Sequence, residues 1–122
     1  MQSMPFDFLL NYLPANVVVE RTLAMYFVYY EKKIVLILRK LKKTPQHNGL
    51  WIPTNKLEHD SLKAAIPAIT DFQFEEGEMT ESHWLLLAEE QDDFEDAAIE
   101  VCALISKRDK RIGRVTKKSV LI

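Results

Sequence analysis

Two apolar runs separated by a charged break dominate the hydrophobic pattern of the chain. Residues 23–30 are rich in aromatic and aliphatic side chains, the break is Glu31-Lys32-Lys33, and residues 34–41 continue as an aliphatic run. Aromatic and β-branched residues in runs of this length are typical of strands. The pattern therefore predicts a β-hairpin at the centre of a sheet. Neither run alternates cleanly between apolar and polar residues, which indicates strands covered on both faces over part of their length.

The predicted hairpin lacks the residues of a tight turn. Two-residue hairpin turns favour Gly and Asn, because these residues tolerate positive φ, whereas this loop offers only Glu and Lys. We therefore expect a longer connection, or one based on a type I turn. Upstream, residues 17–19 open a further strand, and the pattern leaves open whether residues 17–30 form one long strand or two short ones.

The remaining periodicity predicts helices around this sheet. Asn55 with Glu58 three residues later resembles a capping box at a helix start. The order of elements predicts an α+β fold: a single two-layer domain whose largely antiparallel sheet of about five to six strands is flanked by N-terminal, middle and C-terminal helices. The expected helices are residues 4–13, a middle helix from Asn55 to residue 66, and residues 93–106; the further strands are residues 50–52, 70–76 and 83–88.

Length and composition fit one globular domain. The chain has 122 residues, of which 48% are hydrophobic, with a mean hydropathy of -0.13. No apolar run reaches the roughly 20 residues that span a bilayer, and the first ten residues lack a basic signal region. Cys102 is the single cysteine, which agrees with a reducing compartment. We therefore expect a cytoplasmic protein.

The net charge of -2 conceals a strong segregation of charge along the chain. Residues 32–43 hold six basic residues and no acid, residues 64–106 hold twelve acids without Lys or Arg, and residues 107–118 hold seven basic residues against Asp109. Residues 107–122 show little periodicity. We expect the α+β domain to occupy residues 1–106, followed by a basic tail that is flexible or ordered by a partner rather than folded by itself.

Side chains suited to catalysis or metal binding are scattered. His47, His59 and His83 show neither the pair spacing nor the cysteine partner of a zinc site. Cys102 lies on the apolar stripe of the last predicted helix, which is typical of a buried structural thiol. The three glycines are isolated, and solvation of turns and of a helix face explains the acids of residues 71–100. We expect no enzymatic activity, no metal, no cofactor and no small-molecule ligand.

Charge leaves two functions open. The favoured one is a non-catalytic interaction module that pairs with itself as a homodimer or captures a basic segment of a protein partner. The alternative is a nucleic-acid-binding protein, in which Tyr26, Tyr29 and Tyr30 stack on bases and cations contact phosphates. Convergence of the two basic segments would favour nucleic acid. The candidate phosphate contacts are Lys32, Lys33, Arg39, Lys40, Lys42, Lys43, Lys107, Arg108, Lys110, Arg111 and Arg114.

Four pieces of the chain carry a family resemblance: residues 29–36 (YYEKKIVL), 50–52 (LWI), 83–87 (HWLLL) and the helix at 93–106. In their order they resemble the MmcQ/YjbR-like proteins, and the first half is similar to the TfoX N-terminal domains. The resemblance covers most of residues 4–106. The chain departs from the family at Lys32, where a Gly usually precedes the hairpin lysine, and it lacks the family's Ser-Tyr near the final helix. The resemblance implies a compact α+β fold and a DNA-binding role without catalytic residues.

Overall fold

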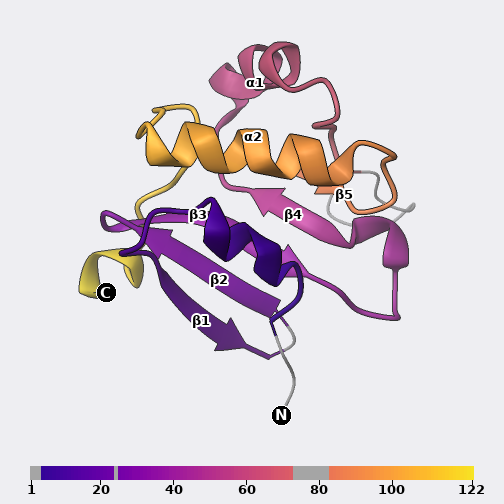
Figure 1. Cartoon of the computed structure of the whole chain (residues 1–122). Coiled ribbons are helices and arrows are strands. Elements are labelled where there is room, and N and C mark those ends of the chain that lie inside the picture. Colours follow the sequence, from indigo (N-terminus) through magenta and orange to yellow (C-terminus); the bar gives the residue numbers. More distant parts are fainter. Residues whose placement is uncertain (1–3, 24, 73–82) are drawn as a thin grey trace.

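An antiparallel sheet of five strands forms the centre of the computed structural model, which describes residues 4–23, 25–72 and 83–122 (Figure 1). The strand order follows the chain, so each strand pairs with its neighbours in sequence. This confirms the predicted α+β class with a largely antiparallel sheet. The strands are β1 (Val18–Thr22), β2 (Met25–Tyr30), β3 (Lys33–Arg39), β4 (Gly49–Ile52) and β5 (Leu85–Ala88).

Two α-helices and four 3-10 turns accompany the sheet in the described part of the chain. The predicted N-terminal α-helix is a 3-10 turn, because Phe6 precedes it in the left-handed conformation and supplies no capping side chain. Asn55 does cap the middle helix, since its side chain accepts a hydrogen bond from the Leu57 amide at 3.0 Å. The helical elements are η1 (Asp7–Asn11), η2 (Pro45–His47), η3 (Lys56–Glu58), α1 (His59–Ala65), α2 (Phe94–Ser106) and η4 (Ser119–Leu121).

The hairpin between β2 and β3 closes more tightly than its sequence predicts. Tyr30 pairs with Lys33, so the loop contains two residues, and both have positive φ: 50° at Glu31 and 65° at Lys32. Positive φ at both positions is the signature of a type I′ turn, and the expectation of a longer connection is wrong. The left-handed conformation costs a non-glycine residue about 1–2 kcal/mol. The pairing of two buried strands outweighs this cost.

The two faces of the sheet bury different sets of residues. α2 and η1 lie on one side of the sheet (Figure 1). The opposite side carries a smaller cluster of Tyr29, Ile34 and Ile37, against which Trp51 and Ile122 pack. Coverage on both faces, as predicted for the central hairpin, is confirmed by the burial of six of the seven residues of β3. The predicted stripe of α2 is buried in full: Phe94, Ala97, Ala98, Val101, Cys102 and Ile105.

Residues 107–122 pack onto the domain as folded structure instead of extending from it as a tail. Arg114 and Ile34 exchange both backbone hydrogen bonds, at 2.9 and 3.0 Å, which places the segment beside the start of β3. The Gly113 amide donates to the Pro53 carbonyl at 2.7 Å. Ile112 is 3% exposed and Ser119 is fully buried. The sequence pattern does not predict this packing, because the segment has no hydrophobic period of its own and docks through isolated residues.

A few local details complete the fold. The predicted strand at residues 70–76 and the turn after it lie largely outside the described residues, although Thr70 forms a bridge with Leu86. His47 is buried beside the ring of Phe72. Leu57, at the start of the middle helix, is 92% exposed. No helix among the described residues has the length and apolar character needed to cross a membrane.

Candidate functional site

The basic segment at residues 32–43 is divided between the two ends of β3. Lys32 and Lys33 lie at the start of the strand, Arg39 ends it, and Lys40, Lys42 and Lys43 follow. At about 3.3 Å per residue, the seven-residue strand separates these groups by about 20 Å. The segment therefore does not form a single positive patch.

One half of that segment meets the C-terminal residues. The backbone of Gly113 packs against the side chain of Lys33, and Lys32 Nζ donates to the carbonyl oxygen of Ile122. Arg108 Nε donates to Glu31 Oε1 at 2.7 Å in the adjacent hairpin turn. We call Lys32, Lys33 and residues 107–118 the basic end. The two basic segments converge here, but only through the first two residues of the earlier one.

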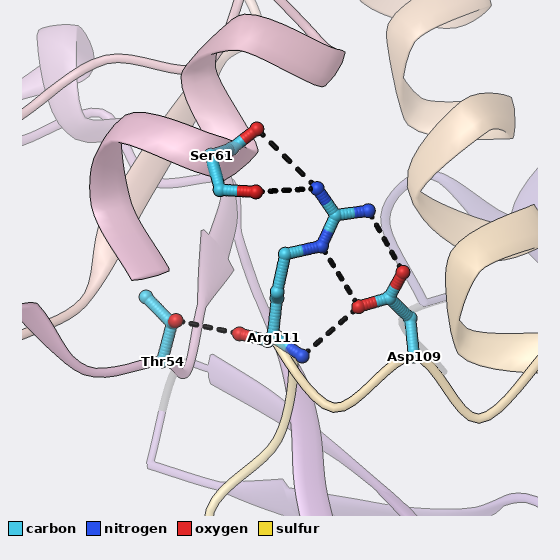
Figure 2. A network of polar contacts seen from close by, with 4 residues as sticks. All are labelled: Thr54, Ser61, Asp109 and Arg111. Carbon is cyan, nitrogen blue, oxygen red and sulfur yellow. Dashed lines mark hydrogen bonds and ion pairs between the residues drawn. The ribbon is translucent and has the colours of Figure 1, made fainter. Parts of the chain in front are cut away.

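Arginines at the basic end hold the fold together. Arg111 forms a bidentate pair with Asp109, with Nε–Oδ1 at 2.9 Å and Nη2–Oδ2 at 2.8 Å, and also donates to Ser61 Oγ at 2.8 Å (Figure 2). This hydrogen bond from Arg111 holds the pKa of the Asp109 carboxyl below its ordinary value. Thr54 donates to the Arg111 carbonyl and accepts, through its own carbonyl, from Arg114. These guanidinium groups join the C-terminal segment to α1 and to the end of β4.

Lysines supply most of the unpaired positive charge at this end. Lys118 pairs with Glu20 at 2.6 Å, and its hydrogen bond to the Glu20 carboxylate lowers the pKa of that group. Within the described ranges, four lysines of the basic end make no hydrogen bond or ion pair through their ammonium groups. They are Lys33, Lys107, Lys110 and Lys117.

At the other end of β3, Arg39 is an internal brace. It is 8% exposed, donates from Nη1 to the Thr44 carbonyl and to Asn48 Oδ1 at 2.8 and 2.9 Å, and donates from Nη2 to the Lys43 carbonyl at 2.7 Å. Burial lowers the pKa of Arg39 from its ordinary value. Arg39 is one of the predicted phosphate contacts, but in the structure its guanidinium donates to the loop that follows β3. Lys42 and Lys43 remain exposed there.

A groove of about 590 Å³ opens at the start of α2. Its apolar lining comes from three phenylalanines, of which Phe6 and Phe94 approach to 5.1 Å between ring centroids. Lys40, which pairs with Glu89, places its ammonium 5.9 Å from the centroid of Phe6. We call this site the acidic groove. Its lining consists of Phe6, Phe8, Phe94, Gln91 and the acids Asp7, Glu89, Asp92, Asp93, Glu95 and Asp96.

The carboxylates of the acidic groove are largely unneutralised. Glu89 pairs with Lys40, but the other five lining acids make no side-chain hydrogen bond or ion pair with any residue that the structure describes. Asp93 stands at the N-cap of α2 without the capping bond itself. Acids in the first turn are stabilised by the positive end of the helix dipole. The negative charge therefore faces solvent beside the half-buried side chains of Phe6 and Phe8.

The sequence pattern shows the acids of this groove but not its aromatic lining. The acids stood out by composition, and were interpreted as solvated faces of turns and of a helix. Phe6 and Phe8 come from the N-terminal segment, which folds back against the start of α2. No local signal connects two segments so far apart along the chain.

Groups suited to catalysis or to base stacking are poorly placed. Cys102 is fully buried, and burial raises the pKa of its thiol to about 12. Tyr29 and Tyr30 are 3% and 8% exposed, so neither ring offers a face for a base. Tyr26 is half-buried, and the guanidinium of Arg21 lies 6.0 Å from its ring centroid. His59 Nε2 lies 2.7 Å from the His83 carbonyl oxygen. The described residues contain no group of three potential metal ligands.

Comparison of the chain with protein-family models, with curated proteins and with solved structures gave no match.

Proposed function

We propose that this protein is a non-catalytic interaction module whose acidic groove binds a cationic segment of a partner protein. The observation that carries the proposal is the combination, in one groove, of three phenylalanine rings with six carboxylates, of which Glu89 alone is ion-paired among the described residues. The residues that line the groove include no Ser, Thr, Cys or Lys nucleophile. The described residues contain no metal-ligand cluster.

Lysine and arginine side chains match this groove in both of their parts. Their apolar stems bury against hydrophobic surface while their charged heads stay hydrated, and a cation over an aromatic ring gains about 0.5–2 kcal/mol. Phe6 and Phe8 can receive the stems, and the carboxylates around them attract the heads. A surplus of one charge sign also speeds the encounter with a partner of opposite charge. The preferred ligand is therefore a segment in which Arg or Lys alternates with apolar residues.

Binding of a labelled peptide tests this function. We expect an Arg- and Leu-containing peptide of net positive charge to bind at low salt, with an affinity that falls as salt rises. The double variant Asp92→Lys/Asp96→Lys should bind at least about tenfold more weakly, which corresponds to about 1.4 kcal/mol. The matched control is Asp60→Lys/Glu100→Lys, which makes the same change of net charge at two exposed acids outside the groove. Equal affinities for the two variants, or no binding by the native protein at low salt, would contradict the proposal.

Nucleic-acid binding through the basic end is a second candidate. It is supported by the convergence of Lys32 and Lys33 with residues 107–118, and it agrees with the role implied by the MmcQ/YjbR-like resemblance. It ranks second because Arg108, Arg111 and Arg114 are engaged in internal bonds. Gel shifts at low salt test this candidate, with the variant Lys107→Glu/Lys110→Glu as the comparison. Absence of binding to both duplex and single-stranded DNA would exclude it.

A further inference from the structure

The two edges of the sheet differ in how they are protected. Beyond β5, Thr70 bridges to Leu86 through two backbone hydrogen bonds of 2.8 and 2.9 Å. β1 has β2 on one side and no described strand on the other, and it lies at the margin of the sheet (Figure 1). A free edge exposes backbone donors and acceptors that can pair with another strand.

β1 has only part of the protection that normally keeps such an edge solvated. Natural edge strands carry charged residues, above all lysine, or proline or a bulge, and β1 has the exposed Arg21 but no lysine, proline or bulge in its five residues. Val18 and Val19 are 44% and 36% exposed, and Leu23 after the strand is 94% exposed. Glu20 pairs with Lys118 at 2.6 Å, and Arg21 is exposed. The N-terminal half of the edge, at Val18 and Val19, is apolar.

We propose that β1 pairs antiparallel with β1 of a second copy of this chain, around a two-fold axis at Val19, so that two sheets join into one. An isologous contact of this kind uses the same residues on both partners and closes at the dimer.

Charge and strand length together select the register of this pairing. A two-fold axis at Glu20 would set Glu20 directly opposite its own copy, and an axis at Arg21 would do the same for that residue. Like charges in directly opposite positions destabilise an antiparallel pair. Axes at either end of β1 avoid this but keep only one residue of the strand paired. An axis at Val19 also opposes no like charges and keeps three residues paired within β1, namely Val18, Val19 and Glu20.

The C-terminal turn extends the same apolar margin. Lys118 binds Glu20 and thereby holds η4 beside β1. Val120 and Leu121 of this turn are 48% and 83% exposed. A short strand by itself buries less than the total of about 1,000 Å² that a specific interface requires. The added surface of η4 on both copies enlarges the contact, and a second copy supplies the same apolar residues in return.

A single introduced cysteine tests the axis directly. Facing residues of an antiparallel pair have Cα atoms about 4.5–5.5 Å apart, within the range that a disulfide spans. Cys102 is fully buried, so the added thiol is the accessible one. We expect Val19→Cys to form a covalent dimer under mild oxidation, seen on a non-reducing gel and reversed by dithiothreitol. A mixture of Val18→Cys with Glu20→Cys should cross-link as well. The control is Leu57→Cys, at a site that is 92% exposed. Cross-linking of Val19→Cys no greater than that of the control overturns the proposal.

A charge at the axis tests the association without oxidation. Val19→Lys sets two ammonium groups opposite each other, and we expect it to raise the dissociation constant of the dimer at least about tenfold in sedimentation velocity. A far-ultraviolet circular dichroism spectrum that matches the native one shows that the variant folds, and Leu57→Lys is the matched control. A native protein that stays monomeric at high concentration, or a Val19→Lys variant that dimerises as the native chain does, overturns the proposal. The edge lies outside the acidic groove, so Val19→Lys should still bind the cationic peptide.

Discussion

The acidic groove and the basic end lie at opposite ends of α2 and use their charges differently. At the basic end, Arg108, Arg111 and Arg114 bind acids, carbonyls and a hydroxyl of neighbouring elements. At the groove, five of six carboxylates have no side-chain partner among the described residues. Charge counted along a sequence is therefore a poor guide to the charge that a partner meets.

The helix itself contributes to this arrangement. Acids are stabilised near the N-terminus of a helix and cations near its C-terminus, by about 0.3–1 kcal/mol each at the surface. Glu95 and Asp96 lie in the first turn of α2, and Lys107 caps its end. Part of the charge segregation is thus explained by the stability of one helix. The remainder, outside that helix, is what a partner can use.

Removing a buried side chain of the basic end should have the largest effect on stability. Ile112→Ala deletes an apolar side chain that is 3% exposed, and we expect it to lower the free energy of unfolding by about 2–4 kcal/mol. Chemical denaturation measures the loss. The control is Val115→Ala, at a position of the same segment that is 62% exposed, where a change within about 0.5 kcal/mol is expected. Equal effects would mean that residues 107–122 do not belong to the cooperative unit.

An aromatic substitution separates ring chemistry from charge in the groove. Phe6→Leu keeps an apolar side chain but removes the ring face, and we expect it to weaken binding of an Arg-containing peptide by about threefold to tenfold. Titration calorimetry measures the affinity. The same variant should bind an uncharged peptide of equal length no differently from the native protein. An unchanged affinity for the cationic peptide would show that the ring of Phe6 does not contribute to binding.

Neutralising Asp109 measures what the arginine pair of the basic end contributes. Asp109 and Arg111 are 20% and 24% exposed, and we expect Asp109→Asn to cost about 1 kcal/mol near neutral pH. Because the pKa of Asp109 is lowered in the folded protein, the native carboxylate stabilises the fold above its unfolded pKa of about 4, and this contribution is lost as pH falls through the folded value. The difference between the two proteins should therefore shrink in acid. If the difference in the free energy of unfolding between the two proteins did not change with pH, the loss would come from packing and not from the charge of Asp109.

The smallest effect is expected at the exposed pair beside the hairpin turn. Arg108 adopts a φ of 58°, a conformation that glycine accepts without strain, while its ion pair with Glu31 is largely solvated. Arg108→Gly should raise the midpoint of thermal unfolding slightly, although it deletes the ion pair. A clear drop in the midpoint would show that this pair contributes more than surface pairs usually do.

The fold class, the central hairpin and the buried stripe of α2 followed from local patterns. Runs of aromatic and aliphatic residues predicted β2 and β3, and a three-to-four residue spacing predicted the helix side that buries Val101 and Cys102. The spacing of buried side chains along a helix or a strand is set by residues close in sequence, so the hydrophobic pattern predicts it directly.

The turn at Glu31, the docking of residues 107–122 and the composition of the groove were decided by tertiary structure. Each depends on partners distant in sequence: paired strands impose positive φ on the turn, Ile34 receives Arg114, and Phe6 reaches Phe94. The order of the residues specifies the sign and the position of every charge in this chain. Whether a charge is bonded inside the protein or faces a partner depended on contacts between elements, because the energy of a charge is set by what surrounds it and not by its neighbours along the chain.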